Sequence, residues 1–448
     1  MLVLAALSPA CPGRPQAPSA PPAADQTVPL GGAVRGVAGD GTTLYAAIES
    51  PPAKADGAAV ESPAPTKAGG AARTTTTIEA RRAGAIAWRT PLPGAGGPLA
   101  ATPTLVAATL VASDALGAGT VRGEPAAAVV ALDAATGAKR FTVLFDSTEW
   151  ALITGIAPLG DDLVVAGSFA GTLRAGPRVV SSAGGSDGFV ARLAPTGEVA
   201  WLVRAGGAGA DGVQGVAARP GEAGTDKIAI AGTFSAGAEL GGIELTAYDE
   251  ASPFGDAFAA VLDGHGARRW AQTFGGRADD AVAGVTIDAR GNVVVAASVH
   301  EVVHVGSTQL VSQGTGDGIV VWFDEGGGYG PATLVGAADF DGLRAIAAVG
   351  DRVIVGGFFS GAIRLADRAL TAGGGDDSFL AALDGSGTVR RAWHLGGDGR
   401  EEVTSLAAIP GGFVAGVAFT ANADLDGAAL PAPADPMAGS ALVVRGLR

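Results

Sequence analysis

The sequence predicts a single all-β domain, a seven-bladed β-propeller built from four-stranded blades. Two series of short apolar segments return along the chain at the same interval. Segments of the first series begin at Ile153, Val213, Val282, Leu343 and Val403, at steps of 60, 69, 61 and 60 residues. In the second series an Asp lies two residues before a five-residue apolar strand, at Asp187, Asp256, Asp317 and Asp377. A repeat of this length made only of strands and turns is typical of a propeller.

Composition supports a packed domain and limits its partners. Of the 448 residues 72 are Gly, 48% are apolar and 17% are charged, so the chain has enough apolar mass for a large core. Lys and Arg number 30 against 44 Asp and Glu, which gives a net charge of −14. This negative field opposes nucleic acid and anionic membranes. We therefore expect any charged partner to be basic.

One repeat is clearest between residues 341 and 400, where turns separate four apolar segments. Their continuous small apolar residues indicate strands that are buried on both faces. The same unit predicts blades at about 31–98, 99–149, 150–210, 211–279, 280–340, 341–400 and 401–448. Within the first blade, residues 49–73 are expected to form a disordered insertion between two strands.

The last unit supplies three strands and requires a fourth from elsewhere. Residues 27–32 read TVPLGG, which is similar to the ends of fourth strands in other units, such as RAWHLGG. We expect this N-terminal strand to complete the last blade and close the ring, because closure removes two exposed sheet edges.

Aromatic residues recur at a fixed place in the units. Trp88, Trp201 and Trp270 each lie four residues after a turn glycine, and Phe141 lies four residues after Gly137. Such a stripe can serve as a stacking platform for sugars or as packing between blades. We favour packing between blades.

The N-terminal region, residues 1–26, precedes the predicted propeller. A short apolar run is followed by Cys11, the single cysteine, and then by a Pro- and Ala-rich tether. This order resembles a bacterial lipoprotein signal, which implies export and a lipid on Cys11 as the only membrane attachment. Plain secretion is the alternative. A single cysteine allows no intramolecular disulfide, and no later apolar run is long enough for a membrane-spanning helix.

Two segment types carry a family resemblance. Residues 184–201 and 273–298 resemble the SBBP-type β-propeller repeats of extracytoplasmic bacterial proteins. Residues 129–141, VVALDAATGAKRF, instead resemble a quinone-type propeller repeat. The resemblance implies a secreted or surface propeller, and it assigns no chemistry.

Two motifs match known metal-binding motifs in amino-acid sequence but not in their expected structural context. His300, Glu301 and His304 form an H-E-x-x-H sequence, which binds catalytic zinc when it lies on a helix. Here β-branched residues surround it, so we expect a strand and the start of a hairpin. Residues 206–213 resemble one copy of a calcium-binding nonapeptide, which binds calcium only in tandem. We therefore predict no catalytic residue, metal site or cofactor.

One set of acidic residues is a candidate site. The repeat places seven aspartates on a single rim of the ring, and we treat this rim as the candidate ligand-binding surface: Asp187, Asp211, Asp256, Asp280, Asp317, Asp341 and Asp377. Exposed together, they would attract cations or basic partners. The alternative is that each Asp caps a turn through its side chain.

The sequence favours a non-enzymatic, exported propeller scaffold, expected to be monomeric, that binds a protein or glycan partner. One alternative is a hydrolase or lyase with carboxylates at the mouth of the funnel. Another is an envelope assembly factor. A propeller can serve each of these functions, so the fold does not decide between them.

Overall fold

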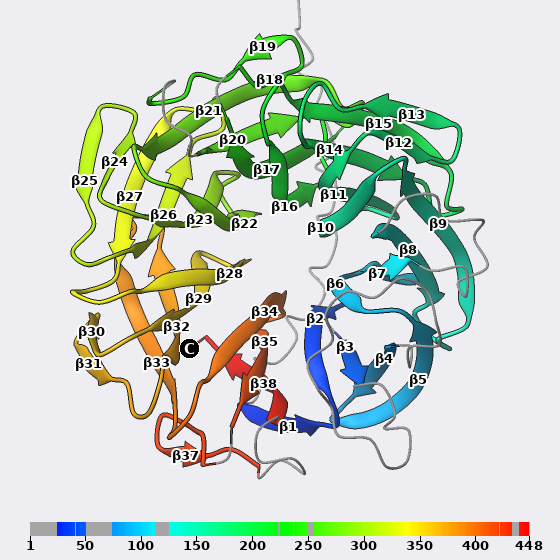
Figure 1. The fold of residues 1–448 in the computed structure, drawn as a ribbon. Helices are drawn as coiled ribbons and strands as arrows, with labels where there is room; N and C mark the ends of the chain where they lie inside the picture. The colour runs from blue at the N-terminus through cyan, green and yellow to red at the C-terminus, as the bar shows by residue number, and fades with distance from the viewer. Residues whose placement is uncertain are drawn as a thin grey trace, which may run out of the picture.

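The computed structural model describes residues 25–40, 42–50, 74–112, 125–222, 225–235, 237–249, 255–420, 422–431 and 439–447. These residues form strands and turns, with no α-helix among them. The strands make seven antiparallel blades around a central axis (Figure 1). The predicted seven-bladed propeller is therefore confirmed. In the described ranges we find no helix with the length and hydropathy needed to cross a membrane.

The first four blades follow one another along the chain. Blade 1 comprises β2 (Ala33–Gly39), β3 (Thr43–Ser50), β4 (Thr75–Arg82) and β5 (Ala85–Pro93). Blade 2 comprises β6 (Gly96–Ala101), β7 (Leu105–Ala112), β8 (Ala126–Asp133) and β9 (Lys139–Ser147). Blade 3 comprises β10 (Trp150–Leu159), β11 (Asp162–Ala170), β14 (Asp187–Leu193) and β15 (Val199–Gly206). Blade 4 comprises β16 (Gly212–Arg219), β17 (Lys227–Phe234), β20 (Asp256–Leu262) and β21 (Arg268–Gly276).

The remaining blades complete the ring. Blade 5 comprises β22 (Ala281–Ile287), β23 (Val293–Val299), β26 (Asp317–Phe323) and β27 (Tyr329–Val335). Blade 6 comprises β28 (Gly342–Val349), β29 (Arg352–Phe359), β32 (Asp377–Asp384) and β33 (Val389–Gly396). Blade 7 comprises β34 (Glu402–Ile409), β35 (Gly412–Phe419), β38 (Gly439–Gly446) and β1 (Gln26–Leu30).

Most of the insertion expected at residues 49–73 lies outside the described residues. Its first two residues, Glu49 and Ser50, instead belong to β3. The two strands that flank the insertion pair directly, with Ser50 opposite Thr75.

Five hairpins connect second and third strands. They are β12 (Thr172–Ala175) with β13 (Arg178–Ser181), β18 (Glu239–Leu240) with β19 (Ile243–Glu244), β24 (Val302–Val305) with β25 (Thr308–Val311), β30 (Ala362–Leu365) with β31 (Arg368–Thr371), and β36 (Asp424–Leu425) with β37 (Ala428–Ala429). Four of the hairpins pair with the fourth strand of the preceding blade and extend its sheet to six strands: β12 on β9, β18 on β15, β24 on β21 and β36 on β33. They thereby cover edges that would otherwise be open to pairing with another chain.

The hydrophobic core lies between blades. Seven clusters of buried side chains occur, and each joins residues of two neighbouring blades. Between blades 4 and 5, for example, Val261 packs in the same cluster as Val295 and Val321. Each blade therefore has one apolar face for each neighbour, which explains the continuous apolar runs in the sequence.

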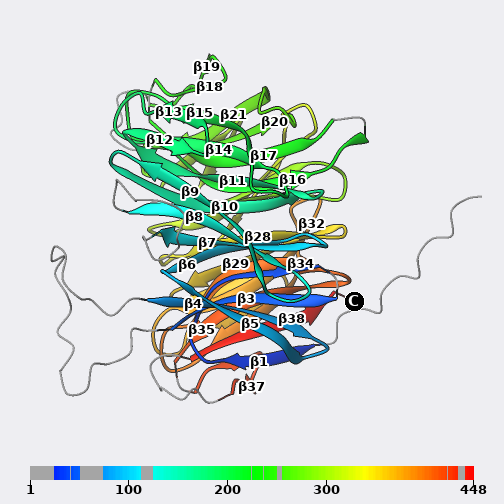
Figure 2. The ribbon, with the colours of Figure 1, turned by 90° about the vertical axis from the view of Figure 1, so that its right-hand side faces the viewer.

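The N-terminal strand closes the ring, as the sequence predicts. β1 pairs antiparallel with β38, from Gln26 opposite Val444 to Leu30 opposite Ser440. Gly446 N donates to Asp25 Oδ1 at 2.9 Å, and the Ser440 hydroxyl donates to the carbonyl of Gly32. Figure 2 shows β1 and β38 together at one edge of the ring. The outer strand of blade 7 thus comes from the opposite end of the described chain.

The aromatic stripe packs between blades, also as predicted. Trp88, Trp201 and Trp270 each lie against a turn glycine of the next blade, where a Cβ would collide with the ring of Trp88 or Trp270 and crowd that of Trp201. Their indole Nε1 groups donate to backbone carbonyls of that same turn, over 3.1, 2.9 and 3.1 Å. The fourth strands of blades 1, 3 and 4 are therefore fastened to the turn between strands three and four of the next blade.

Removing residues 25–32 should lower the melting temperature and promote aggregation, because the deletion exposes the edge of β38. Differential scanning calorimetry and light scattering measure both effects. A peptide with the sequence of residues 25–32, added in trans, should restore part of the stability, and a scrambled peptide should not. An unchanged melting temperature in the deletion would contradict closure by β1.

Trp201→Phe should cost about 1 kcal/mol beyond the lost ring area, since the indole hydrogen bond to Gly264 disappears. Trp393→Phe is the matched control, because Trp393 Nε1 is buried without a hydrogen-bond partner among the described residues. Urea unfolding measures how much each variant lowers the free energy of unfolding, and the difference between the two losses gives the contribution of the hydrogen bond. Equal losses in both would show that the tryptophans act by packing alone.

Candidate functional site

The seven predicted rim aspartates all lie at junctions between blades, and they are buried. None of their side chains is more than 4% exposed. Backbone bridges join the loops that carry them: Asp211 N donates to Ser186 O at 2.8 Å, and Asp341 N donates to Gly316 O at 2.9 Å. The repeat thus brings an Asp of one blade next to an acidic residue of the following blade.

These carboxylates bind backbone N–H groups of their own loops. Ala183 N donates to Asp187 Oδ2 at 2.6 Å, Gly207 N to Asp211 Oδ2 at 2.6 Å and Gln313 N to Asp317 Oδ2 at 2.7 Å. Asp341 and Asp377 accept in the same way from residues four positions earlier, and Asp256 accepts from Tyr248 N. The alternative reading, that each Asp caps a turn, fits this geometry. The expected exposed acidic surface is corrected, because the loops need the carboxylates to satisfy their N–H groups.

Four junctions hold a pair of buried acidic residues: Asp187 with Asp211, Asp256 with Asp280, Asp317 with Asp341 and Asp377 with Glu401. Burial, aided by the charge of the partner carboxylate, raises the pKa of the second member of each pair. It raises the pKa of Asp280 to about 8 and that of Asp341 to about 6. Two adjacent carboxylates in a dry site cannot both ionise without cost.

The H-E-x-x-H segment lacks the helical geometry that the zinc-binding motif requires. Glu301 lies in a bend with φ 53° just before β24, so the helix that the motif requires is absent here. His300 Nδ1 lies 2.8 Å from Asp279 O, whereas His304 stacks on Tyr248 with ring centroids 4.0 Å apart. The two imidazoles have different neighbours. His304 instead helps to line a cavity of about 270 Å³ that Asp256 also reaches.

A second cavity follows the axis. The five segments of the first repeated series each contain a β-bulge in the first strand of a blade, such as the register shift between Val213 and Gly215. The first strand of blade 1 has an equivalent bulge. The bulged residues line a channel of about 230 Å³. Its two arginines are each paired, Arg35 with Glu49 at 3.0 Å and Arg344 with Glu402 at 3.9 Å. The axis is therefore narrow and its charges are compensated.

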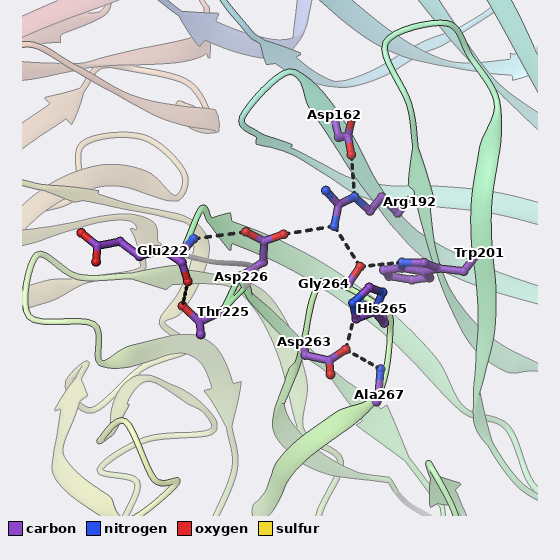
Figure 3. Close-up of polar contacts among 11 residues, drawn as sticks. Asp162, Arg192, Trp201, Glu222, Thr225, Asp226, Asp263, Gly264, His265 and Ala267 are labelled. Atoms are coloured by element: carbon purple, nitrogen blue, oxygen red, sulfur yellow. Dashed lines mark hydrogen bonds and ion pairs between the residues drawn. The ribbon is translucent and has the colours of Figure 1, made fainter.

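The junction between blades 3 and 4 shows how a complete junction is built at the opposite rim (Figure 3). The guanidinium of Arg192 binds Asp162 of its own blade at 2.6 Å and Asp226 of the next blade at 3.1 Å. It also donates to Gly264 O at 2.8 Å, the carbonyl that accepts from Trp201 Nε1. One turn of blade 4 thus fills the space between the two blades.

The junction between blades 6 and 7 lacks this filling. Blade 7 has no turn between its third and fourth strands, because β38 and β1 come from the two ends of the described chain. The side chains differ as well: Arg352, Ala382, Arg391 and Gly411 stand where blades 3 and 4 have Asp162, Arg192, Trp201 and Asp226. A cavity of about 630 Å³ opens there, which we call the junction cleft.

The junction cleft is basic in a protein of net charge −14. Arg352, Arg390 and Arg391 line it together with Asp351 and Leu447. Asp384 binds Arg390 at 2.6 Å, and Asp351 lies 3.8 Å from Arg352. The Arg391 guanidinium lies 4.7 Å above the ring of Trp393 and pairs with none of the described carboxylates. The cleft therefore offers a cation and an adjacent apolar wall to an anionic group.

Sequence reasoning missed this cleft, although a signal was present. In three units a tryptophan follows the turn glycine by four residues, and in blade 6 the residue four after Gly387 is Arg391. The sequence also predicted that β1 completes blade 7. Because β1 comes from the other end of the described chain, no turn connects the third and fourth strands of blade 7 at this junction.

The described residues contain no group of three or more His, Cys, Asp or Glu side chains that could hold a metal ion together. Cys11, the predicted lipidation site, lies outside the described residues.

Stability should fall as pH rises from about 4 to about 8, because Asp280 binds its proton more tightly in the folded chain. This stabilisation is complete below the usual Asp pKa of 3.8 and is lost through the raised pKa of about 8. Asp280→Asn should remove up to about 1.4 kcal/mol per pH unit of this dependence. Chemical unfolding in buffer with a chelator, at several pH values, measures it. A difference between the two proteins that does not change with pH would contradict the assignment.

No protein family model and no curated protein sequence matches the chain. Among solved structures it is similar to europium-containing methanol dehydrogenase, at 13% identity over 95% of this chain and 93% of that one (TM-score 0.42). It is also similar to BamB from Moraxella catarrhalis, at 13% identity over 82% and 90% (TM-score 0.35). The propeller domain of the Trilobed protease from Pyrococcus furiosus gives 9% identity over 94% and 96% (TM-score 0.46). These likenesses concern the propeller fold alone, and the SBBP repeat type and the lipoprotein-like start stay predictions.

Proposed function

We propose that this chain is an extracytoplasmic, non-enzymatic propeller scaffold that binds an acidic segment of a partner protein in the junction cleft. One observation carries the proposal: the cleft is the place where both the repeat and the packing between blades are broken. Repeat positions that serve packing elsewhere carry Arg352 and Arg391 there. An extracytoplasmic location follows from the resemblance of residues 184–201 and 273–298 to exported repeats.

The chemistry of the cleft favours an anionic partner over a basic one. Guanidinium groups bind carboxylates with two parallel hydrogen bonds, which makes arginine well suited to an Asp or Glu side chain. This revises the sequence expectation of a basic partner, which depended on the net charge. Local charge at the cleft is opposite to the overall charge.

The hydrolase or lyase alternative receives less support from the geometry. It depended on carboxylates at the mouth of the funnel. The seven rim aspartates are buried, and six of them accept hydrogen bonds from backbone N–H groups, so they do not form an open acidic surface as a group. A glycan partner remains an outcome that the binding experiment can identify.

A fluorescent peptide of ten glutamates serves as the probe. Fluorescence anisotropy should detect binding to wild type, and the affinity should weaken with added salt as the Debye length falls from about 10 Å at 0.1 M. Arg352→Gln with Arg391→Gln should weaken binding at least about tenfold.

Arg174→Gln with Arg364→Gln is the matched control, because these arginines are exposed at equivalent positions of the hairpin strands β12 and β30. This control should bind the peptide as wild type does. Equal losses in the two double variants would reduce the binding to general surface charge. Binding of a neutral oligosaccharide in preference to the peptide would replace the proposal with a glycan partner.

A further inference from the structure

Of the four acidic pairs, those at the junctions of blades 4 and 5 and of blades 5 and 6 receive no basic side chain from the described residues, unlike the two pairs that Arg204 and His394 contact. In the pair of blades 4 and 5 the carboxylate oxygens also converge. Asp256 begins β20, and Asp280 directly precedes β22. Asp256 Oδ1 and Asp280 Oδ2 approach the same face of Gly275, where a Cβ would collide with both oxygens. The two side chains are 4% and 3% exposed. Oxygens from two blades therefore converge on one buried point.

One of these oxygens has no hydrogen-bond partner. Asp280 Oδ2 is buried and accepts no hydrogen bond from any described residue. An unpaired buried carboxylate oxygen is costly, because this oxygen has lost its hydration without gaining a hydrogen bond. A group that supplies positive charge at this point would remove that cost.

Two other junctions supply such a charge from the protein itself. Arg204 Nη1 donates to Asp187 Oδ2 at 3.2 Å, and His394 Nε2 lies 2.8 Å from Asp377 Oδ2. Both residues are paired in the sheet with the Phe that follows the Asp by two positions. The residue at this position in blade 4 is Thr273, which is neutral and donates its hydroxyl to Thr246 O. The nearby Arg277 is 77% exposed and pairs with Asp249 at 3.6 Å.

A cavity reaches Asp256, the first member of the pair. It encloses about 270 Å³ and is lined by Asp256, Gly275, Thr273, Tyr248, His304 and Tyr329. A water molecule occupies about 30 Å³ of liquid, so the cavity can hold several waters beside the carboxylate. An ion bound there could keep part of its hydration shell. The remaining ligands of such an ion need not be side chains.

We propose that Asp256 and Asp280 bind one hard divalent cation, Ca²⁺ or Mg²⁺, at the junction of blades 4 and 5. Carboxylate oxygens are the ligands that both ions prefer, and each ion accepts waters and backbone carbonyls for the rest of its shell. Ca²⁺ tolerates irregular sites with six to eight ligands, whereas Mg²⁺ demands six in a near-ideal octahedron. The ion takes the role that Arg204 has at the junction of blades 3 and 4, and it ties blade 4 to blade 5.

Calorimetric titration of the full chain, stripped with a chelator and dialysed at pH 8, tests the site with CaCl₂, MgCl₂ and KCl of matched ionic strength. One divalent ion should bind and raise the melting temperature by several degrees, and KCl should not. Asp280→Asn should weaken binding at least about tenfold and abolish the thermal shift. This variant should fold, because the substitution removes the repulsion within the pair. The ion that binds with the higher affinity shows whether the site is selective for Ca²⁺ or for Mg²⁺.

Asp211→Asn is the matched control in the pair that Arg204 compensates, and it should keep the full response to the ion. Circular dichroism shows whether each variant is folded. An absent response of wild type to both ions would overturn the proposal and leave a pair that shares a proton. An undiminished response in Asp280→Asn would overturn it equally, as would equal losses in Asp211→Asn.

Discussion

The apolar junction between neighbouring blades is the interaction on which the rest of this structure depends. Every core cluster joins two blades, so a single blade has no complete core of its own. Each blade gains its stability only when both neighbours cover its faces, and the ring must therefore close. The strand pair β1–β38 provides that closure, and the tryptophans and turn glycines fasten neighbouring blades at one rim. The bulges at the axis and the hairpins at the outside add to a ring whose stability depends on packing between blades.

Because all seven junctions share apolar packing between blades, their polar side chains can differ without loss of the fold. The junction of blades 3 and 4 is filled and charge-balanced by Arg192, Asp162 and Asp226. The junction of blades 6 and 7 lacks a turn and carries arginines. The junction of blades 4 and 5 has an acidic pair without a compensating basic side chain from the described part of the protein. Function in this propeller is expected where a junction departs from the common plan. The axial channel is narrow, and its arginines are paired with glutamates.

The sequence predicted the fold well because the apolar residues that repeat along the chain are the ones that pack between neighbouring blades. Two registers of apolar residues identified the last five blades, comparison with the same unit added the first two, and TVPLGG predicted the strand β1. The predicted rim failed as a surface for a different reason. Asp187 and its counterparts share a rim, but sequence spacing does not tell whether a carboxylate faces water or its own loop. The junction cleft depends on a missing turn and on Arg391 at a tryptophan position, two facts that have meaning only when the ring is closed in three dimensions. Pairing of Asp256 with Asp280 across blades likewise requires the backbone bridge between their loops.

A circular permutant tests the central claim, that the cleft left by ring closure is the binding site. Its new termini lie between β3 and β4, and residue 446 is joined to residue 25 by Asp-Gly-Ser-Gly, the turn of residues 384–387. This turn supplies blade 7 with the connection that the other blades have and fills the cleft. Anisotropy with the decaglutamate probe should show affinity reduced at least about tenfold while the melting temperature is retained. Unchanged affinity in a permutant that folds normally would contradict the account.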